Sequence, residues 1–329
     1  MKQKQQFQQQ LLKWYDKHGR KNLPWQVEDA YFVWISEIML QQTQVAKVID
    51  YFNRFIKTFP NLEKLSSADV SEVLSHWSGL GYYNRARNIH KAALMCFEKY
   101  AGCLPEDLTQ LMALPGIGKT TAAAILSLTW NKPYAILDGN VKRVMSRVFR
   151  LKADKSSQLN KKLWNQVEQL VSQKRARNYN QALMDLGSMI CTRSKPKCLK
   201  CPLANLCQSY QTGVVDQYPQ KKAKTKQIAV TLHALLYFKG DCVFLQKRQN
   251  KGIWPELWFL PLAHSIVENQ DARIVSFAIK HILSHRILTI NVYVMKEINR
   301  QQEGQWISIK DLNETPHPSA LTRVLNEIN

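Results

Sequence analysis

The chain has 329 residues, a length that favours two domains over one. It carries 46 Lys and Arg against 25 Asp and Glu, a net charge of +21 at pH 7 that favours a polyanionic partner, most often nucleic acid. It contains no apolar run of about 18 residues, so no membrane span is expected. The polar start, MKQKQQFQQQ, lacks a signal core, so we expect a cytoplasmic protein whose seven cysteines are thiols or metal ligands.

The first two-thirds of the chain is patterned as helices. Apolar residues recur at helical spacing over 7–18, and a long amphipathic stretch over 31–55 has an interruption near Thr43. Further helices are predicted over residues 67–75, 84–99, 108–114, 118–128, 139–150, 158–173 and 179–189. Because no alternating apolar run appears before about residue 227, this region is predicted to be all-α.

The stretch 111–128 is predicted as helix, tight turn, helix, with Gly116 and Gly118 in the turn. A helix N-terminus has free N–H groups that bind phosphate, and Lys119 adds a positive charge. A nucleotide-binding P-loop is excluded, because it needs glycine where Ala113 stands. A plain corner between helices and a helix-hairpin-helix that holds a DNA backbone both remain open.

Glu37 lies among large apolar residues in the predicted helix VWISEIMLQQTQV. Loss of hydration there would raise the pKa of its carboxyl and keep it protonated near neutrality, as a general acid requires. The simpler alternative is a solvent-facing glutamate on an amphipathic helix. The polar residues that follow, Gln41, Gln42, Thr43 and Gln44, suit a strip that meets bases, with Gln41 and Gln44 on the helical face of Glu37.

The segment GLGYY, ending at Tyr82 and Tyr83, is predicted as a glycine turn that opens a helix with Arg85 and Arg87. Aromatic rings beside basic residues suit stacking on bases or wedging between them. A helix cap with a core tyrosine explains the same pattern, so this segment alone does not establish a DNA contact.

Asp138 directly precedes the helix predicted over 139–150. As its N-cap, the carboxylate would accept backbone N–H bonds, which with the helix dipole lower its pKa. Asp138 would then stay ionised while Glu37 stays protonated. Two carboxyl groups with separated pKa values are the pattern of glycosidic cleavage, in which one protonates the leaving group and the other faces the oxocarbenium-like sugar.

Four of the cysteines have the spacing C-x6-C-x2-C-x5-C, namely Cys191, Cys198, Cys201 and Cys207. In a reducing compartment this cluster predicts a metal site. A zinc ion on four thiolates and an iron–sulfur cluster are both allowed by the spacing. The basic residues between the cysteines would then form a rigid loop against phosphates. The other cysteines, Cys96, Cys103 and Cys242, are predicted to be buried apolar residues.

The remainder of the chain has a different composition. Residues 211–227 include the run KKAKTK and are predicted as a basic linker after a helical domain at 1–210, which contains the hairpin at 111–128 and the cysteine loop at 191–207. Residues 228–329 are predicted as a smaller α+β domain. Its predicted elements are a hairpin of strands 228–238 and 241–246, strands 288–295 and 305–309, and helices near 271–283 and 319–328.

Together these motifs resemble the adenine DNA glycosylases of the MutY type, in the helix-hairpin-helix base-excision superfamily. The segments that carry the resemblance are WISEIMLQQTQV, GLGYYNRARN, LPGIGKTTAAAILSL, ILDGNVKRV and NQALMDLGSMICTRSKPKC. The likeness is dense over about residues 7–210 and looser beyond. It implies the helix-hairpin-helix glycosylase fold, a [4Fe-4S] cluster on the four cysteines, and a C-terminal Nudix-like domain that senses 8-oxoguanine.

The resemblance also implies roles for single residues. Glu37 would protonate adenine N7 and then handle water, Asp138 would stabilise the oxocarbenium, and Asn140 would be a close partner in the site. Gln42 and Tyr82 would enter the base stack, and Gln181 would contact adenine. Further DNA contacts are implied for Gln41, Thr43, Gly116, Gly118, Lys119, Ser284 and His285.

Two departures from family patterns bear on the reaction. Relatives that also cut the strand carry a nucleophilic lysine where this chain has Thr120, and Lys119 is one residue too early to replace it. The family's lesion-sensing loop reads Phe-Ser-His, whereas Leu283-Ser284-His285 keeps only the polar pair. Scattered acids such as Glu268 and Asp271 do not form the metal-binding helix of a Nudix pyrophosphatase, so that hydrolysis is not expected.

We therefore expect a monofunctional, monomeric glycosylase that removes adenine opposite 8-oxoguanine or guanine in double-stranded DNA. It would act in a bacterial cytoplasm on nucleoid DNA and pass its abasic product to downstream repair proteins. One alternative is an oxidised-pyrimidine glycosylase of the same superfamily, which Thr120 and the extra domain disfavour. The other is a non-catalytic iron–sulfur protein that binds DNA and senses redox state, which the two carboxyl groups in matching motifs disfavour.

Overall fold

The structure is a computed structural model that describes residues 2–153, 155–220, 227–263, 277–283, 285–296, 298 and 303–328. Its contacts divide the chain into two units. The helical unit is Met1–Ser67 with Asn88–Lys222, and the C-terminal unit is Ala68–Arg87 with Ala223–Asn329. Among the described helices, none has the length and apolar character needed to cross a membrane.

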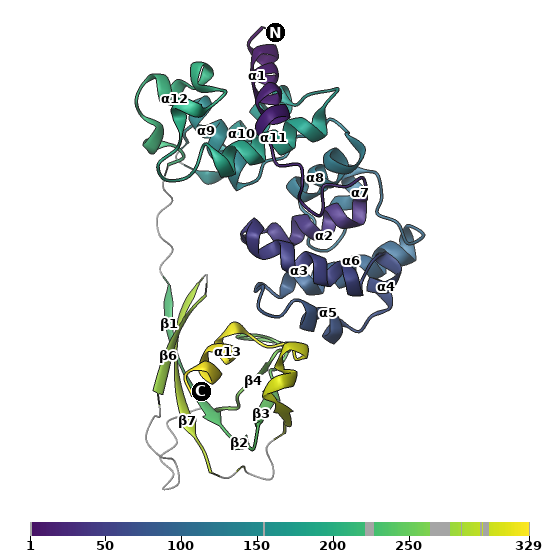
Figure 1. Ribbon diagram of the computed structural model, residues 1–329, viewed down its shortest axis with the longest axis vertical. Coiled ribbons are helices and arrows are strands. Elements are labelled where there is room, and N and C mark those ends of the chain that lie inside the picture. Colours follow the sequence, from purple (N-terminus) through teal and green to yellow (C-terminus); the bar gives the residue numbers. More distant parts are fainter. Residues whose placement is uncertain are drawn as a thin grey trace. The chain divides into compact units, whose positions relative to one another are not determined.

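The helical unit confirms the all-α prediction for the first part of the chain (Figure 1). The predicted helix over 31–55 is two helices, α2 and α3, with the interruption at residues 41–44. The short helix α4 was not predicted. The helices of this unit are α1 (Lys2–His18), α2 (Ala30–Leu40), α3 (Val45–Thr58), α4 (Leu62–Ser67), α6 (Asn84–Lys99, from Asn88 on), α7 (Leu108–Met112), α8 (Lys119–Trp130), α9 (Gly139–Val148), α10 (Ser156–Leu170), α11 (Ala176–Met189) and α12 (Gln208–Gln211), with 3-10 turns η1 (Cys198–Lys200), η2 (Ala204–Leu206) and η3 (Val215–Gln217).

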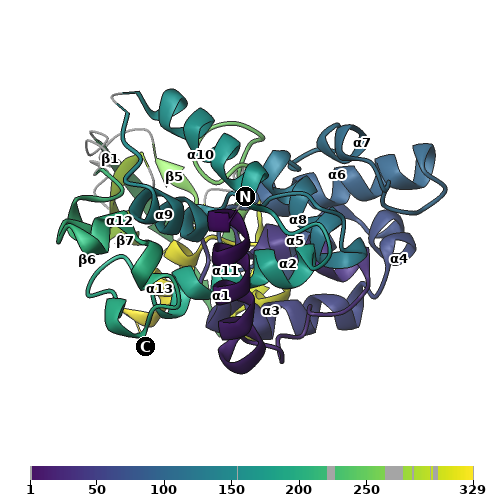
Figure 2. The ribbon, with the colours of Figure 1, turned by 90° about the horizontal axis from the view of Figure 1, so that it is seen from above.

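Helix α8 forms the centre of the helical unit. Its sequence, KTTAAAILSLTW, consists largely of small and aliphatic residues, and it is buried over most of its length. A helix that is apolar around its circumference lies inside a core, and α8 packs against α2, α7 and α11. Helix α1 packs against α11, as Figure 2 shows from above. Helix α8 and the two segments that carry Glu37 and Asp138 therefore belong to one packed framework of helices.

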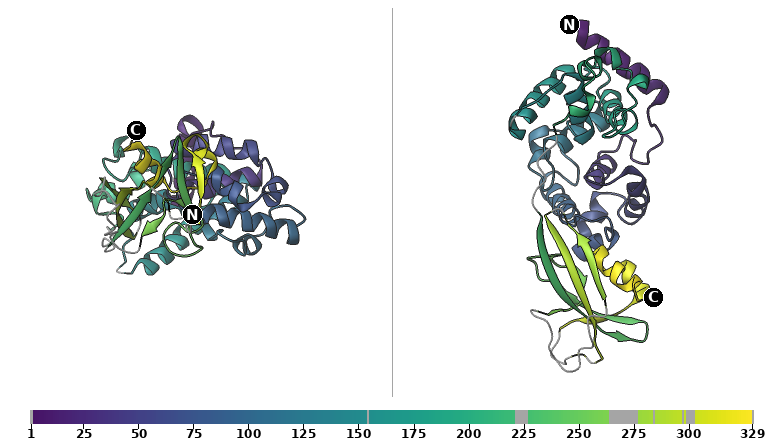
Figure 3. Two further views of the ribbon diagram at one scale, coloured as in Figure 1. Left: turned by 90° about the horizontal axis from the view of Figure 1, so that it is seen from below. Right: turned by 90° about the vertical axis from the view of Figure 1, so that its left-hand side faces the viewer.

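The C-terminal unit contains two small sheets. The first has the strand order β5-β1-β7-β6, with β1 parallel to β7 and β6 antiparallel to β7. In the second, β3 pairs with β2, β4 and β8. The strands are β1 (Ile228–Leu236), β2 (Phe238–Lys239), β3 (Cys242–Lys247), β4 (Trp258–Phe259), β5 (Leu262–Ala263), β6 (Phe277–Ile282), β7 (Arg286–Val294) and β8 (Gln305–Ser308), and the helices are α5 (Val70–His76), η4 (Ile309–Glu314) and α13 (Ser319–Asn326). Helix α13 covers the sheet beside β6, as the right-hand view of Figure 3 shows.

Several predictions for this unit need correction. The predicted hairpin forms between β2 and β3 around Gly240, but β1 pairs with β5 and β7 instead. The helix predicted near 271–283 is wrong over Phe277–Ile282, which is strand β6; residues 271–276 lie outside the described residues. Ile279 is buried while Lys280 is exposed, so this stretch alternates as a sheet requires. Cys103 is exposed, contrary to its predicted burial.

Residues Ala68–Arg87 group with the C-terminal residues, although they lie inside the range 1–210 predicted as one domain. They include α5 and the glycine turn with Tyr82 and Tyr83. Helix α5 packs against η4 within this unit. A domain range drawn from the sequence is continuous, whereas packing collects segments that are distant along the chain.

Candidate active site

Glu37 lies in the last turns of α2, between buried residues such as Trp34 and Ile38. The helix begins at Asp29, whose side chain accepts hydrogen bonds from the backbone of Tyr31 at 2.8 Å and Phe32 at 3.2 Å. Burial, and secondly the charge of Asp138, raise the pKa of Glu37 from its usual 4.5 to about 7. The side chain is still partly accessible. Because burial disfavours the charged form, the carboxyl of Glu37 can hold a proton near neutrality.

Asp138 is the N-cap of α9, as predicted. Its Oδ1 accepts the backbone N–H of Val141 at 2.7 Å, and its Oδ2 accepts the side-chain amide of Asn140 at 3.0 Å. Because both carboxylate oxygens have a donor, the orientation of the group is fixed. Asn140 is thus the direct partner that the sequence resemblance implied.

The segment that leads to Asp138 is held by two other helices. Asn180 on α11 accepts from the backbone N–H of Ile136 at 3.1 Å and donates to the carbonyl of Tyr134 at 2.8 Å. Thr120, at the start of α8, donates its hydroxyl to the carbonyl of Leu137 at 3.3 Å. Thr120 therefore supports the backbone directly before Asp138.

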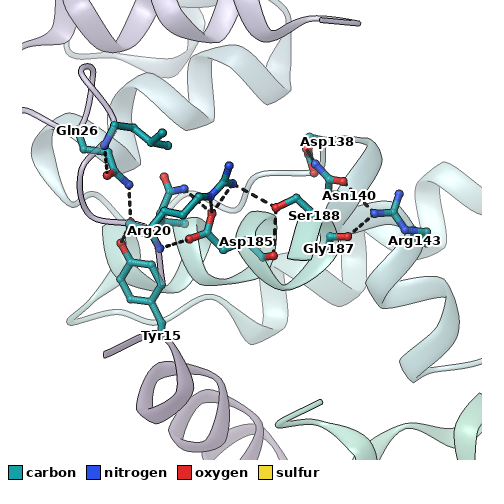
Figure 4. A network of polar contacts seen from close by, with 11 residues as sticks. Tyr15, Arg20, Gln26, Asp138, Asn140, Arg143, Asp185, Gly187 and Ser188 are labelled. Atoms are coloured by element: carbon teal, nitrogen blue, oxygen red, sulfur yellow. Dashed lines mark hydrogen bonds and ion pairs between the residues drawn. The ribbon is translucent and has the colours of Figure 1, made fainter. Parts of the chain in front are cut away.

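Arg143 bonds to Asn140 and Gly187, as Figure 4 shows, and also to Cys191 at the start of the cysteine loop. Its Nη2 donates to Asn140 Oδ1 at 2.9 Å and to the carbonyl of Gly187 at 2.6 Å, and its Nε donates to the carbonyl of Cys191 at 2.7 Å. A planar guanidinium can make these bonds in fixed directions. The orientation of Asn140, and through it Asp138, therefore depends on the position of Cys191.

Gln181 belongs to a second network, around the buried carboxylate of Asp185; Figure 4 shows Asp185 beside Arg20. Asp185 is fully buried and accepts from Arg20 three times: from its backbone N–H at 2.7 Å, its Nε at 2.9 Å and its Nη2 at 2.6 Å. Gln181 donates its amide to Asp185 Oδ1 at 3.1 Å. The buried carboxylate of Asp185 therefore sets which end of the Gln181 amide stays available. The sequence analysis did not identify Arg20 or Asp185; the signal it offered was an acid one helical turn after Gln181, beside the apolar residues Leu183, Met184 and Leu186.

A cavity of about 200 Å³ lies beside Gln181 in the helical unit. Aromatic and amide side chains dominate its wall, which is formed by Tyr15, Lys21, Trp25, Gln26, Val27, Val33, Leu128, Arg177, Asn178 and Gln181. Glu37 and Asp138 are not among these residues, but Val33 is one helical turn before Glu37 on α2. The cavity thus has flat walls and amide groups, with the candidate acid one turn away.

The polar strip that follows Glu37 is not helical. Gln41 and Gln44 were predicted to share a helical face with Glu37. This prediction is wrong, because helix α2 ends at Leu40. Gln42 is exposed and has a φ of 58°, in the left-handed region. Non-glycine residues hold this conformation only where the surroundings impose it, and such positions cluster at functional sites. Thr43 lies between Gln42 and the start of α3, where its backbone N–H bonds to the carbonyl of Leu40 at 3.2 Å.

The two glycines of the hairpin turn differ in how far their surroundings require glycine. Gly116 has a φ of 80°, and a Cβ there would lie 2.8 Å from the Cβ of Asn88. Gly118, the N-cap of α8, has a φ of −94°, and a Cβ there would meet open space. Neither its backbone conformation nor its packing therefore requires glycine. Lys119 bonds to Glu168 at 2.7 Å, and its Nζ lies 4.2 Å from the ring centroid of Trp164. Lys119 would have to exchange Glu168 for a phosphate on binding DNA.

The four clustered cysteines line one small cavity together with apolar residues of α9 and α11. Buried Arg147 donates to Cys191 Sγ at 3.3 Å and to the carbonyl of Thr192 at 2.7 Å. Within the described ranges, no three His, Cys, Asp or Glu side chains are arranged to hold a single metal ion. Four thiol groups that line one cavity are a donor set that either a zinc ion or an iron–sulfur cluster could use.

Comparison with known proteins places the chain in a family. The model of the HhH-GPD superfamily base excision DNA repair proteins matches residues 35–169, and the NUDIX domain model matches residues 233–327. The adenine DNA glycosylase of Buchnera aphidicola subsp. Baizongia pistaciae is 39% identical over 98% of this chain and 96% of its own length. The chain belongs to the adenine DNA glycosylases. The human adenine DNA glycosylase is 43% identical over 64% of this chain and 40% of its own length.

Solved structures confirm the glycosylase fold of the helical part. A thermostable thymine-DNA glycosylase, at 30% identity, matches 64% of the chain with a TM-score of 0.59. A non-covalent endonuclease III–DNA complex matches with a TM-score of 0.54 at 24% identity, a likeness in fold alone. In this adenine DNA glycosylase family member, the predicted helix-hairpin-helix fold and the Nudix-like C-terminal domain are both confirmed.

Of the predicted lesion-sensing residues, His285 lies in the short connection between β6 and β7. Leu283 donates its backbone N–H to the carbonyl of Arg286 at 2.8 Å, which closes this hairpin of the glycosylase. His285 is exposed there, while Ser284 lies outside the described residues. An exposed hairpin tip can reach a base without disturbing the sheet behind it.

Proposed function

We propose that this chain hydrolyses the N-glycosidic bond of adenine mispaired with 8-oxoguanine or guanine in double-stranded DNA, acting as a monomer. The observation that carries the proposal is the pair of carboxyl groups with different surroundings. Glu37 has a pKa raised to about 7, and Asp138 is held by Val141 and Asn140 at the N-terminus of α9. One group can donate a proton at neutral pH while the other faces positive charge.

The reaction would proceed in two steps. The adenosine is turned out of the duplex, since chemistry on a base requires its removal from the stack. Glu37 donates its proton to adenine N7, the bond between the sugar and the base breaks, and the electron pair leaves with the neutral base. The sugar becomes an oxocarbenium ion beside the Asp138 carboxylate. Water then adds to the sugar carbon, and the ionised Glu37 accepts the proton of that water, which regenerates the acid.

The cavity beside Gln181 supports a site for the extruded adenine. The aromatic ring of Trp25 offers a flat wall for a purine, and Gln26, Asn178 and Gln181 offer amide donors and acceptors. Because Asp185 holds the Gln181 amide, its free end has a fixed polarity that can select one purine edge. A base seated there would lie one helical turn from Glu37.

DNA would be held by the hairpin and opened by the two left-handed residues. The N-terminus of α8, with Gly116, Gly118 and Lys119, would bind a phosphate. Gln42 and Tyr82 would enter the base stack, each exposed at a position of positive φ. Gln41 and Thr43 would contact the strand beside Gln42. The net charge of +21 would strengthen the binding and make it fall steeply with salt.

Cys191, Cys198, Cys201 and Cys207 would hold a [4Fe-4S] cluster, which when bound supplies a rigid anchor for the basic loop between them. The all-thiolate donor set and the shared cavity support this assignment. Iron and acid-labile sulfide analysis of the purified protein should give four of each per chain, and none with Cys198→Ser. Zinc in place of iron would contradict the assignment.

The opposite base would be read by Ser284 and His285. His285→Ala should lower adenine release opposite 8-oxoguanine more than release opposite guanine, because only the former has the extra polar edge. Equal losses on both duplexes would remove this part of the proposal. Leu283, in the position of the family's phenylalanine, adds no ring to stack on the lesion.

The decisive experiment is single-turnover adenine release on duplexes that carry adenine opposite 8-oxoguanine or guanine. Glu37→Gln keeps the size of the side chain but removes the proton, so we expect release to be abolished while duplex binding survives. Asp138→Asn should lower the rate by more than about tenfold, or roughly 1.4 kcal/mol of barrier. A Glu37→Gln protein with wild-type release would refute the mechanism. Release of thymine glycol instead of adenine would favour an oxidised-pyrimidine glycosylase.

A further inference from the structure

The turn that carries Tyr82 has an unusual backbone. Gly79, Gly81 and Tyr82 have φ values of 83°, 81° and 53°, all in the left-handed region. Tyr82 is the non-glycine residue of the three, and its side chain is 47% exposed. A residue other than glycine keeps this conformation only when neighbouring groups hold it. The turn therefore needs support from neighbouring groups while the Tyr82 ring stays partly exposed.

Part of the support comes from residues close in sequence. The indole of Trp77 donates to the carbonyl of Gly81 at 3.1 Å, and Arg85 Nη2 donates to the same carbonyl at 3.0 Å. The guanidinium carbon of Arg85 lies 5.4 Å from the centre of the Tyr82 ring and 5.3 Å from that of Trp77. These contacts hold one side of the turn.

The second support comes from the far end of the chain. The hydroxyl of Tyr83 accepts the backbone N–H of Gly79 at 3.2 Å and donates to the backbone carbonyl of His317. The hydroxyl of Ser78 donates to the same carbonyl at 3.3 Å. Tyr83 and Ser78 thus tie the start and the end of the turn to His317.

His317 is itself a fixed point. It is 7% exposed, and its imidazole is bonded through Nδ1 to the carbonyl of Thr315 at 2.7 Å and through Nε2 to the hydroxyl of Thr322 at 3.0 Å. Because both ring nitrogens are engaged at the start of α13, the carbonyl of His317 has little freedom to move. A group that is hydrogen-bonded to this carbonyl is therefore held in place as well.

A third contact lies just beyond the turn. Arg87 Nε bonds to Glu256 Oε2 at 3.1 Å, and Arg87 Nη2 donates to the carbonyl of Pro255. The turn is therefore attached to two separate loops of the C-terminal chain, one around residue 256 and one around residue 317.

We propose that Tyr83 is a positioning residue through which the C-terminal residues around His317 hold the Tyr82 turn ready to enter a base stack. The inference rests on the proposed function, because it takes Tyr82 as the residue that enters the stack. It means that the region that would sense the opposite base and the turn that would open the stack are parts of one packed unit. Removing residues 228–329 would then disturb both, so single substitutions are the cleaner test.

The test uses the full chain and a duplex with 2-aminopurine next to the mispaired adenine, whose fluorescence rises when stacking is disturbed. Tyr83→Phe removes only the hydroxyl, and Ser78→Ala removes the neighbouring bond to the same carbonyl. Tyr293→Phe is the matched control, since it breaks a hydrogen bond to His233 of 2.9 Å elsewhere in the unit. Thermal unfolding of each variant monitors folding. Adenine release is measured on the same duplexes under single-turnover conditions.

We expect Tyr83→Phe to lower the fluorescence change and the release rate by about two- to tenfold, the range that loss of one neutral hydrogen bond allows. Ser78→Ala should also lower the fluorescence change and the release rate, whereas Tyr293→Phe should leave both quantities unchanged. In a Tyr82→Ala background, Tyr83→Phe should add no further loss, because it acts through Tyr82.

Three outcomes would overturn the inference: a Tyr83→Phe protein with wild-type fluorescence change, losses from Tyr82→Ala and Tyr83→Phe that multiply, or a Tyr82→Ala protein with wild-type fluorescence change. The last would also remove Tyr82 from the base stack. The proposed reaction would still stand in every case if Glu37→Gln abolished adenine release, so the two failures are distinguishable.

Discussion

Asp138 lies close enough to Glu37 for its charge to raise the pKa of the Glu37 carboxyl, which together with the larger effect of burial brings it to about 7. The protonated form of Glu37, which would donate the proton to adenine, predominates below this pKa and is lost above it. We therefore expect the single-turnover rate to be level at low pH and to fall about tenfold per pH unit above pH 7. A rate that stays constant from about pH 6 to pH 9 would contradict Glu37 as the acid.

The same pKa has a consequence for stability. Because burial raises the folded-state pKa of Glu37 from 4.5 to about 7, the folded state binds more protons than the unfolded state between these values. The contribution of Glu37 to the free energy of unfolding is therefore present at low pH and is lost as the pH rises through 7. Glu37→Gln should stabilise the protein by on the order of 2–3 kcal/mol at pH 8 and change little at pH 4. Urea unfolding at both pH values measures this, and equal effects at both would contradict it.

Local sequence patterns predicted most helices of the helical unit, the cap formed by Asp138 and the raised pKa of Glu37. Helix α6 begins and ends where its pattern does. Asp138 caps α9 because a carboxylate just before a helix can accept one of its unpaired backbone N–H groups. The raised pKa of Glu37 followed from its apolar neighbours along one helix. These features depend on residues within one or two helical turns, which a sequence displays directly.

Features made by distant residues were not predictable. Arg20 meets Asp185 across 165 positions, and Tyr83 meets His317 across 234. No spacing rule joins such pairs, because folding decides which helices become neighbours. Strand β6 was assigned to a helix for a related reason, since its pairing with β7 outweighs the local preference of a short segment. The same limit hid the role of Arg143, because two of its acceptors, the carbonyls of Gly187 and Cys191, lie 44 and 48 positions further along the chain.

Arg143→Lys should reduce adenine release without loss of the cysteine centre. Lysine keeps the charge but cannot donate in the directions of Asn140, Gly187 and the carbonyl of Cys191 together. With Asn140 released, the Asp138 carboxylate loses its fixed orientation, and we expect a loss of about tenfold or more in single-turnover rate. Arg175→Lys, which alters an exposed pair with Asp16, serves as control. An unchanged rate, or a loss explained by missing iron, would contradict this role.

The enzyme should release adenine without forming a covalent product through Lys119. The amine of Lys119 bonds to Glu168 at 2.7 Å and lies over the ring of Trp164. We predict that Thr120 stands where strand-cutting relatives carry their nucleophilic lysine. Borohydride added during turnover should therefore trap no adduct in high yield. A high-yield adduct that disappears in Lys119→Gln would contradict a monofunctional reaction. Lys142→Gln is the matched control, because this lysine follows Asp138 by one turn of α9.

Gly116 and Gly118 should differ in what a methyl group does. In Gly116→Ala the new Cβ would lie 2.8 Å from Asn88 at a φ of 80°, so we expect a loss of about 1–3 kcal/mol in stability. Gly118→Ala meets open space at an ordinary φ and should leave stability nearly unchanged. If the N-terminus of α8 binds a DNA phosphate, however, this methyl group stands in its way, and duplex affinity should fall. Denaturant unfolding and duplex titration separate the two effects. Equal affinity in Gly118→Ala and wild type would move the phosphate away from this helix end.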